Sequence, residues 1–199
     1  MDKLRIYLIT GWGKGKTTSA IGIAARALAN GENVLFCQFL KSGVDSGIKC
    51  LSDYSRDFGG EFKFISQNVS GFVRINCTNF WSECLKEIKE FKPALIIFDE
   101  LNTALDYGLI DDNIDNLFAQ LKLISRDSDI YLTGRINNYI IRHQMIEFAD
   151  VATNCYCEKH HYNHLCPSCS LEFMEDYNYC PSCGEKLLPR ILAKKGREY

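Results

Sequence analysis

The residues with the clearest chemical potential form a glycine-rich segment close to the N-terminus. An apolar run leads into Thr10, which is followed by Gly11, Trp12, Gly13, Lys14, Gly15, Lys16, Thr17 and Thr18. Glycines let backbone N–H groups surround phosphate oxygens, and the N-terminus of a following helix adds partial positive charge. The residues from Gly11 to Thr18 are therefore predicted to bind a nucleotide.

Lys16 and Thr17 have the most specific roles in this prediction. Lys16 would reach a phosphate, and Thr17 would offer its hydroxyl to Mg²⁺. The strict P-loop pattern has a glycine where this chain has Thr10, five residues before Gly15. The segment is thus a variant P-loop, and the alternative is a glycine-rich turn that binds no ligand.

Two further apolar runs end in charged residues. Asp99 and Glu100 follow the run 94–98, where carboxylates of a P-loop protein hold Mg²⁺ or its waters. If that strand continued, the two side chains would point to opposite sides. Arg135 follows the run 130–133 and could neutralise a polyphosphate, unless it belongs to a surface turn.

A second candidate centre is made of cysteines near the C-terminus. Cys166 and Cys169 form one C-x-x-C pair, Cys180 and Cys183 form another, and ten residues separate the two pairs. Two such pairs complete a tetrahedral Cys₄ site for structural Zn²⁺, with iron as the alternative metal. A unit of roughly thirty residues cannot bury enough apolar surface to fold alone, so a metal is predicted as its core.

A denser group of possible ligands precedes these pairs. It consists of Cys155, Cys157, His160, His161 and His164. Its imidazoles and thiols could form a second metal site or contact a metal in a substrate, and the residues alone leave both readings open.

Composition excludes several classes of protein. The formal charge is 23 − 25 = −2, which gives no sign of the basic surface of a nucleic-acid-binding protein. No apolar run approaches the roughly 20 residues that a membrane-spanning helix needs, and the start of the chain does not match a signal peptide. A cytoplasmic protein with no nucleic-acid or membrane partner is expected, in which cysteines bind metal or are buried.

The elements that must position these residues alternate between strands and helices. Strands are predicted over residues 4–9, 34–39, 62–65, 94–98, 130–133 and 151–155, and helices over 17–29, 79–90, 113–125 and 139–148. Strands that are apolar throughout are typical of a parallel sheet buried on both faces. The expected fold is α/β, a P-loop NTPase (RecA-like) doubly wound, mostly parallel sheet with a small zinc ribbon.

Two domains are predicted from a change in composition. Residues 1–155 form the P-loop nucleotide-binding domain, and residues 156–199 form the Cys/His-rich ribbon, with its metal core over 166–183 and a tail that returns to the main domain.

These segments together resemble the P-loop ATP:corrinoid adenosyltransferases. The matching segments occur in family order over nearly the whole chain and are 10–18, Ala24-Ala25-Arg26-Ala27, Gln38-Phe39-Leu40-Lys41, Phe98-Asp99-Glu100-Leu101 with Ala104, Thr133-Gly134-Arg135, Ala149-Asp150, Lys159-His160 and 195–199. The variant loop with a threonine at position 10 is itself a feature of that family.

The resemblance implies a reaction and its participants. A cobalt(I) corrinoid attacks the 5′ carbon of ATP, which lies reversed in the P-loop, and triphosphate is expelled. Lys16, Glu100 and Arg135 are the implied catalytic residues, and Thr17 and Glu100, with Asp99, the implied Mg²⁺ ligands. The family also implies a homodimer that works in adenosylcobalamin synthesis or salvage.

Two departures from the family concern substrate contacts. Trp12 stands where the family usually has a polar residue, so its indole could pack on a base or on the corrin ring. Phe72 and Arg74 correspond to a segment near the lower ligand position of cobalt, with Arg74 where tryptophan is expected and core packing as the alternative role of Phe72. His160 falls in the segment that closes near the active site. Phe72, Arg74 and His160 are thus the expected corrinoid contacts.

Other functions remain compatible with the sequence. The ribbon could cover the corrinoid pocket, dock a reductase or a corrinoid-accepting protein, or stabilise the tail. A thymidine-kinase-like nucleoside kinase also joins a P-loop sheet to a zinc unit, and it would release ADP. A non-enzymatic nucleotide- or corrinoid-binding regulator is the third alternative.

Overall fold

The computed structural model describes residues 4–41, 46–57, 59–67 and 75–156, together with the backbone of residues 164, 165, 168, 172, 173, 186, 188 and 189. The chain divides into two compact units, Met1–Tyr156 and Cys157–Tyr199. The first unit carries the phosphate loop and the charged strand ends.

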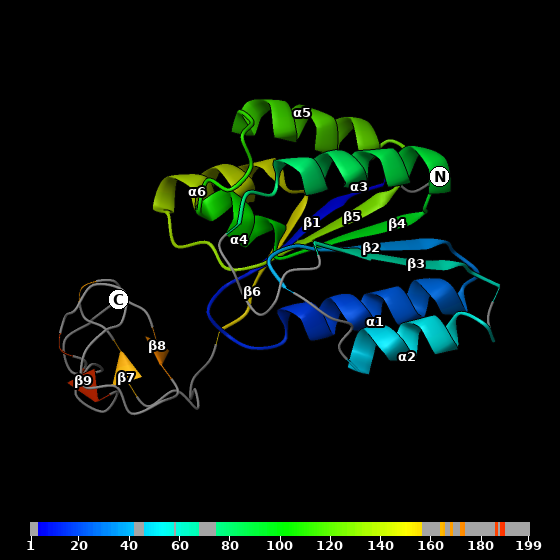
Figure 1. Ribbon diagram of the computed structural model, residues 1–199, viewed down its shortest axis with the longest axis horizontal. Helices are drawn as coiled ribbons and strands as arrows, with labels where there is room; N and C mark the ends of the chain where they lie inside the picture. The colour runs from blue at the N-terminus through cyan, green and yellow to red at the C-terminus, as the bar shows by residue number, and fades with distance from the viewer. Residues whose placement is uncertain are drawn as a thin grey trace. The chain divides into compact units, whose positions relative to one another are not determined.

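The first unit is built on a six-stranded sheet in which every pair of neighbouring strands is parallel (Figure 1). Its strands are β1 Ile6–Thr10, β2 Val34–Gln38, β3 Phe62–Ser66, β4 Leu95–Asp99, β5 Asp129–Thr133 and β6 Val151–Asn154. Their order is β3-β2-β4-β5-β1-β6. The predicted α/β fold with a parallel sheet is confirmed, and the strand bounds differ from the predicted ones by at most two residues.

Helices cover both faces of the sheet (Figure 1). One layer consists of α1 Lys16–Ala29 and α2 Ser46–Tyr54, and the other of α3 Thr78–Phe91, α4 Leu101–Asp106, α5 Ile114–Ile124 and α6 Tyr139–Phe148. The sequence prediction missed α2, in which Ile48 and Leu51 are the buried residues, and α4, which has six residues. Both are too short for helical periodicity to be distinctive.

The core follows from the alternation of side chains along each strand. In β4, Leu95 and Ile97 belong to the apolar cluster with α1 and α2, while Ile96 and Phe98 belong to the cluster with the other helices. All four side chains are at most 3% exposed. Burying each contributes about 1.5–3 kcal/mol, so a strand that is apolar throughout is stable only between two helical layers.

The strand order decides where the polar residues meet. β5 lies between β4 and β1, so the strands that end in Asp99, Thr133 and Thr10 are neighbours. Because all the strands are parallel, their carboxyl ends lie along one edge of the sheet, where α/β proteins bind ligands. The phosphate loop and the acidic pair therefore share one edge.

The second unit contains three short strands in an antiparallel sheet of order β8-β7-β9. They are β7 His164–Leu165, β8 Glu172–Phe173 and β9 Leu188–Pro189. Cys166, Cys169, Cys180 and Cys183 lie outside the described residues, so the zinc ribbon stays a prediction. In the described part of the chain, no helix has the length and apolar character needed to cross a membrane.

Candidate active site

The phosphate loop joins β1 to α1 and is anchored to the segment after β6. The Gly13 N–H donates to the Cys155 carbonyl oxygen at 2.7 Å, and the Cys155 N–H donates to the Thr10 carbonyl oxygen at 2.7 Å. A Cβ atom on Gly13 would lie 2.7 Å from that same Cys155 oxygen. Glycine at position 13 is therefore required for the loop to pack against the segment after β6.

The N-terminus of α1 faces the loop with its amides open. Gly15 precedes the helix in the left-handed conformation, with φ of 106°, and no side chain of the described residues caps the helix. The first N–H groups of any helix lack intrahelical acceptors. Those of Lys16, Thr17 and Thr18 can therefore bind phosphate oxygens, as predicted for a P-loop.

Lys16 points back into the loop. Its Nζ donates to the carbonyl oxygens of Gly11 and Gly13, both at 2.8 Å, and the residue is only 8% exposed. Burial, and next the guanidinium of Arg135, lowers the pKa of Lys16. An anion bound in the loop would offset both effects, because a nearby negative charge favours the protonated form of this ammonium.

Asp99 is the most extensively hydrogen-bonded carboxylate of the site. It is fully buried and accepts from Thr17 Oγ1 at 2.9 Å, from Thr133 Oγ1 at 2.6 Å and from Gln38 Nε2 at 3.0 Å. These donors come from α1, β5 and β2. Asp99 thus links three elements at the carboxyl edge of the sheet. Of its three hydrogen-bond donors, Thr17 was predicted from the sequence as a site residue.

Glu100 turns toward the same side as Asp99. Strand β4 ends at Asp99, and Glu100 has φ of 62° at the start of α4. Lys41 Nζ lies 3.2 Å from Asp99 Oδ2 and 3.1 Å from Glu100 Oε1. The side chains of Asp99 and Glu100 were expected to point to opposite sides only if the strand continued through both residues. The backbone turns at Glu100 instead, and the two carboxylates therefore contact the same cation.

Sequence reasoning did not assign Lys41 to the site. Burial disfavours its charge, but Asp99 and Glu100 outweigh that effect and raise the pKa of Lys41. The available signal was Gln38, a polar residue that ends an otherwise apolar strand three positions before Lys41. Only the pairing of β2 with β4 brings both residues to Asp99.

Arg135 reaches the site through a close contact between two elements. Its backbone N–H donates to Thr103 Oγ1 at 3.0 Å, and Thr103 Oγ1 donates to Glu100 Oε2 at 2.6 Å. Gly134 has φ of 134°, and a Cβ atom there would lie 2.7 Å from Thr103 Oγ1. Gly134 thus permits the approach of α4, and Thr103 is a second site residue that the sequence did not reveal.

The indole of Trp12 lies against Arg135. The Arg135 Cζ atom is 5.2 Å from the centroid of the Trp12 ring, within the range of cation–π attraction. Trp12 is 40% exposed. The indole thus packs on a guanidinium, and its predicted contact with a base or a corrin ring stays a prediction.

The oxygen atoms at this edge suit a magnesium ion. Thr17 Oγ1, Asp99 and Glu100 supply hydroxyl and carboxylate oxygens, the ligands that Mg²⁺ prefers, and the ammonium of Lys41 already lies among them. In the described part of the chain, no three His, Cys, Asp or Glu residues form a metal-binding group. Phosphate oxygens or water would have to complete the coordination.

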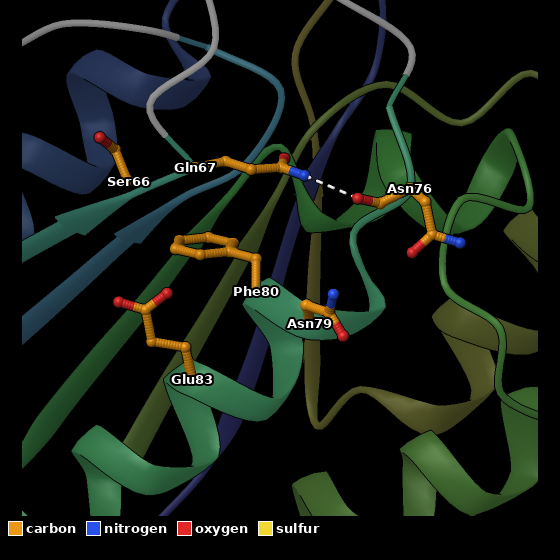
Figure 2. Close-up of a pocket in the computed structure, with 6 residues that line it drawn as sticks. All are labelled: Ser66, Gln67, Asn76, Asn79, Phe80 and Glu83. Atoms are coloured by element: carbon orange, nitrogen blue, oxygen red, sulfur yellow. Dashed lines mark hydrogen bonds between the residues drawn. The ribbon is translucent and has the colours of Figure 1, made fainter.

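A pocket of about 340 Å³ opens between the end of β3 and the start of α3, and Figure 2 shows its walls. It is lined by Ser66, Gln67, Asn76, Asn79, Phe80 and Glu83. Gln67 reaches across to donate from Nε2 to the Asn76 carbonyl oxygen at 2.9 Å. Amides, a hydroxyl, one ring and one carboxylate therefore face the pocket, and none of the described residues in its lining is a cation.

Gln67 connects this pocket to the phosphate side of the sheet. The backbone N–H of Gln67 donates to the Gln38 carbonyl oxygen at 3.3 Å, and the side-chain Oε1 of Gln67 accepts from the Leu40 N–H at 3.3 Å. Gln38 in turn donates to Asp99. The pocket and the acidic pair are thus joined through consecutive hydrogen bonds.

The expected corrinoid contacts lie outside the described residues. Phe72 and Arg74 belong to the segment 68–74, which connects the pocket residue Gln67 to Ile75, next to Asn76. His160 lies in the second unit and is also not described. Their roles stay predictions.

Comparison with known proteins identifies a family that this chain matches. The family model of ATP:corrinoid adenosyltransferase BtuR/CobO/CobP matches residues 2–169. A corrinoid adenosyltransferase of Pseudomonas aeruginosa is 28% identical over 166 residues, which cover 80% of this chain and 78% of that protein. The corrinoid adenosyltransferase CobA of Salmonella typhimurium is 26% identical over 136 residues, 65% of this chain and 67% of that protein.

A solved structure supports the fold alone. The flagellar accessory protein FlaH from Methanocaldococcus jannaschii superposes with a TM-score of 0.59 at 15% identity, covering 75% of this chain and 70% of FlaH. The family match spans the phosphate loop, the acidic pair and Arg135. This chain therefore belongs to the ATP:corrinoid adenosyltransferase family.

Proposed function

We propose that this chain transfers the 5′-deoxyadenosyl group of ATP to the cobalt(I) of a corrinoid. A cobalt–carbon bond forms at C5′, the bond between C5′ and the phosphate oxygen breaks, and triphosphate leaves with the electron pair. Membership of the adenosyltransferase family supports this reaction. Reduced cobalt is the nucleophile, so no side chain has to attack the substrate.

The observation that carries the proposal is the arrangement of cations around the loop. Lys16 lies inside the loop, and Arg135 is held beside it by Thr103 and Trp12. Negative charge builds on triphosphate as it departs, and preorganised donors stabilise such charge more strongly than mobile water does. Lys16, Arg135 and the first amides of α1 would bind the leaving group.

Mg²⁺ fits the oxygen set described above. Thr17, Asp99 and Glu100 would hold it, and when bound it would supply charge that neutralises the polyphosphate. Gln38 and Thr133 fix the Asp99 carboxylate, and Thr103 fixes that of Glu100. Both carboxylates are therefore oriented before a substrate binds.

The corrinoid is proposed to lie over the carboxyl ends of β2 and β3. The pocket at Gln67 and Glu83 is too small for a whole corrin ring, but it fits amide side chains at the ring edge. The amide and carboxylate side chains that line the pocket can form hydrogen bonds with the N–H and C=O groups of the corrinoid amides. Phe72 and Arg74, in the segment that adjoins this pocket, are the proposed contacts to the ring itself.

Several properties of the whole protein belong to the same proposal. A Cys₄ zinc ribbon forms the second unit, where a reductase or corrinoid-accepting protein could dock, and the protein acts as a homodimer. It works in the cytoplasm, and the free thiols of Cys37, Cys77 and Cys84 are consistent with a reducing compartment.

An anaerobic assay tests the reaction directly. Purified protein is mixed with a chemically reduced corrinoid and Mg-ATP, the loss of cobalt(I) absorbance is followed, and the phosphate products are separated. The proposal expects alkylated cobalt and triphosphate in equal amounts. Release of ADP with a phosphorylated nucleoside acceptor would indicate a kinase, and binding without turnover would indicate a regulator.

A further inference from the structure

A lysine from outside the phosphate loop lies among the proposed metal ligands. The Lys41 ammonium is 3.1 Å from Glu100 Oε1, 3.2 Å from Asp99 Oδ2 and 3.3 Å from Thr17 Oγ1. Thr17, Asp99 and Glu100 are the residues to which the proposed function assigns Mg²⁺. One ammonium thus contacts an oxygen of every protein ligand.

The two lysines of the site have separate positions. Lys16 donates to the carbonyl oxygens of Gly11 and Gly13 inside the loop, whereas Lys41 comes from the end of β2 and contacts the acids. The metal-ligand oxygens therefore have their own cation, distinct from the lysine of the phosphate loop.

A buried carboxylate needs such a cation. Asp99 is fully buried, and its partners Thr17, Thr133 and Gln38 provide hydrogen bonds but no charge. A buried charge without a counter-ion is strongly unfavourable. Within the described part of the chain, Lys41 supplies the positive charge that pairs with Asp99.

A divalent ion bound to these oxygens would repel the ammonium of Lys41 and compete with it. Mg²⁺ approaches its ligands to about 2.1 Å, which would leave the two cations only about 4 Å apart. The side chain of Lys41 is 30% exposed, and its flexible stem can turn toward solvent. The ammonium thus has a route out of the site.

We infer that Lys41 is the resident cation of this site in the metal-free protein and leaves when a divalent cation binds. The inference rests on the proposed Mg²⁺ ligands. Lys41 accordingly stabilises the unliganded acids and weakens metal binding by competition. Its removal should strengthen metal binding, whereas loss of an ordinary supporting residue would weaken it.

Binding of Mn²⁺ alone, measured by electron paramagnetic resonance without ATP or corrinoid, tests this competition. Lys41→Met removes the charge and keeps the length, Lys41→Arg keeps the charge, and Lys86→Met alters an exposed lysine of α3. Lys41→Met should bind Mn²⁺ about fivefold more tightly, while the other two variants stay near wild type. Equal or weaker binding by Lys41→Met would overturn the inference.

A second measurement uses the unaltered protein, in case Lys41→Met does not fold without metal. Amine-reactive labelling of Lys41 is followed by mass spectrometry with and without Mg²⁺ at constant ionic strength, and Lys86 serves as the reference. Release of the ammonium should increase the labelling rate of Lys41 severalfold relative to Lys86. An unchanged or lower rate contradicts the inference.

These results are separable from the outcome of the transfer assay. Adenosyl transfer with unchanged Mn²⁺ binding and labelling would reject the role of Lys41 and leave the proposed function intact. Competition by Lys41 without any adenosyl transfer would support the cation exchange and reject the reaction. Absence of Mn²⁺ binding to every variant would also overturn the exchange.

Discussion

The guanidinium of Arg135 lies over the indole of Trp12, with its Cζ atom 5.2 Å from the ring centroid. Trp12 belongs to the phosphate loop and Arg135 follows β5, so the contact joins two separate parts of the site. The ring therefore places a cation beside the phosphate loop.

Replacement of Trp12 by alanine should weaken binding of triphosphate by about twofold to fivefold, because Arg135 loses an attraction of about 0.5–1 kcal/mol. Trp12→Phe should retain most of the affinity. Trp12 and Trp81 are the two tryptophans, and Trp81 is buried. Triphosphate should therefore change the fluorescence of the wild type but not of Trp12→Phe, and an identical change in both would show that Trp81 is the reporter.

Lys16→Ala should lower the rate of adenosyl transfer by a factor on the order of 10² to 10³, since it removes a preorganised cation from the leaving group. The rate is measured from cobalt(I) absorbance and triphosphate release under saturating substrates. Lys86→Ala changes an exposed lysine in an i,i+4 pair with Glu90 and serves as the control. A Lys16→Ala enzyme that folds normally and reacts at the wild-type rate would remove the loop from the mechanism.

Gly134→Ala should reduce both stability and turnover. Its Cβ atom would collide with Thr103 Oγ1, which accepts from the Arg135 N–H. The expected loss of stability is about 1–3 kcal/mol, measured by denaturant unfolding. Gly108→Ala is the matched control, because Gly108 also has positive φ but nothing lies within 4 Å of its added Cβ. Equal effects of both substitutions on turnover would argue against the Thr103 contact.

Glu83 should select among corrinoids by the charge at the ring edge. A free carboxylate in the pocket would be repelled by Glu83, and the described residues of the lining include no cation that would offset this repulsion. The KM of the wild type should be about fivefold higher for a corrinoid bearing a free carboxylate than for its amide.

Glu83→Lys should reverse that preference, while Glu90→Lys, an exposed charge reversal on the same helix, should not. Unchanged discrimination in Glu83→Lys would place the ring edge outside the pocket.

The second unit should contain about one zinc per chain, measured by elemental analysis of the purified protein. Serine at Cys166 or Cys180 should abolish the zinc and unfold this unit, because the metal is its proposed core. Cys50→Ser, at an exposed cysteine of α2, should leave the zinc content unchanged. A metal-free unit that remains folded would rule out the ribbon.

Much of the fold could be predicted because β2 and β4 are apolar up to their last residue, and such strands are stable only between two helical layers. Lys16, Thr17 and the acidic pair were identified because each directly follows a strand or begins a helix. Lys41 was not, since a lysine beyond a strand end resembles a surface residue. Its role depends on β2 lying beside β4, and the sequence does not specify the order of strands.

The Trp12 contact was missed for a similar reason. A tryptophan in a glycine-rich loop can pack on many partners, and nothing in its local sequence selects Arg135. Thr103 was overlooked because α4 was not predicted. Its contact with the Arg135 backbone is possible only because Gly134 has no Cβ atom. Contacts that arise from close approach of distant elements are invisible to local patterns.

The hydrogen bond from Gly13 to the Cys155 carbonyl has a practical consequence for deletion variants. Cys155 follows the last strand of the sheet, only two positions before the second unit begins at Cys157. A truncation placed at the end of β6 would remove the second unit and also an anchor of the phosphate loop. Loss of activity in such a shortened protein would then say nothing about the second unit, so the cut belongs after Tyr156.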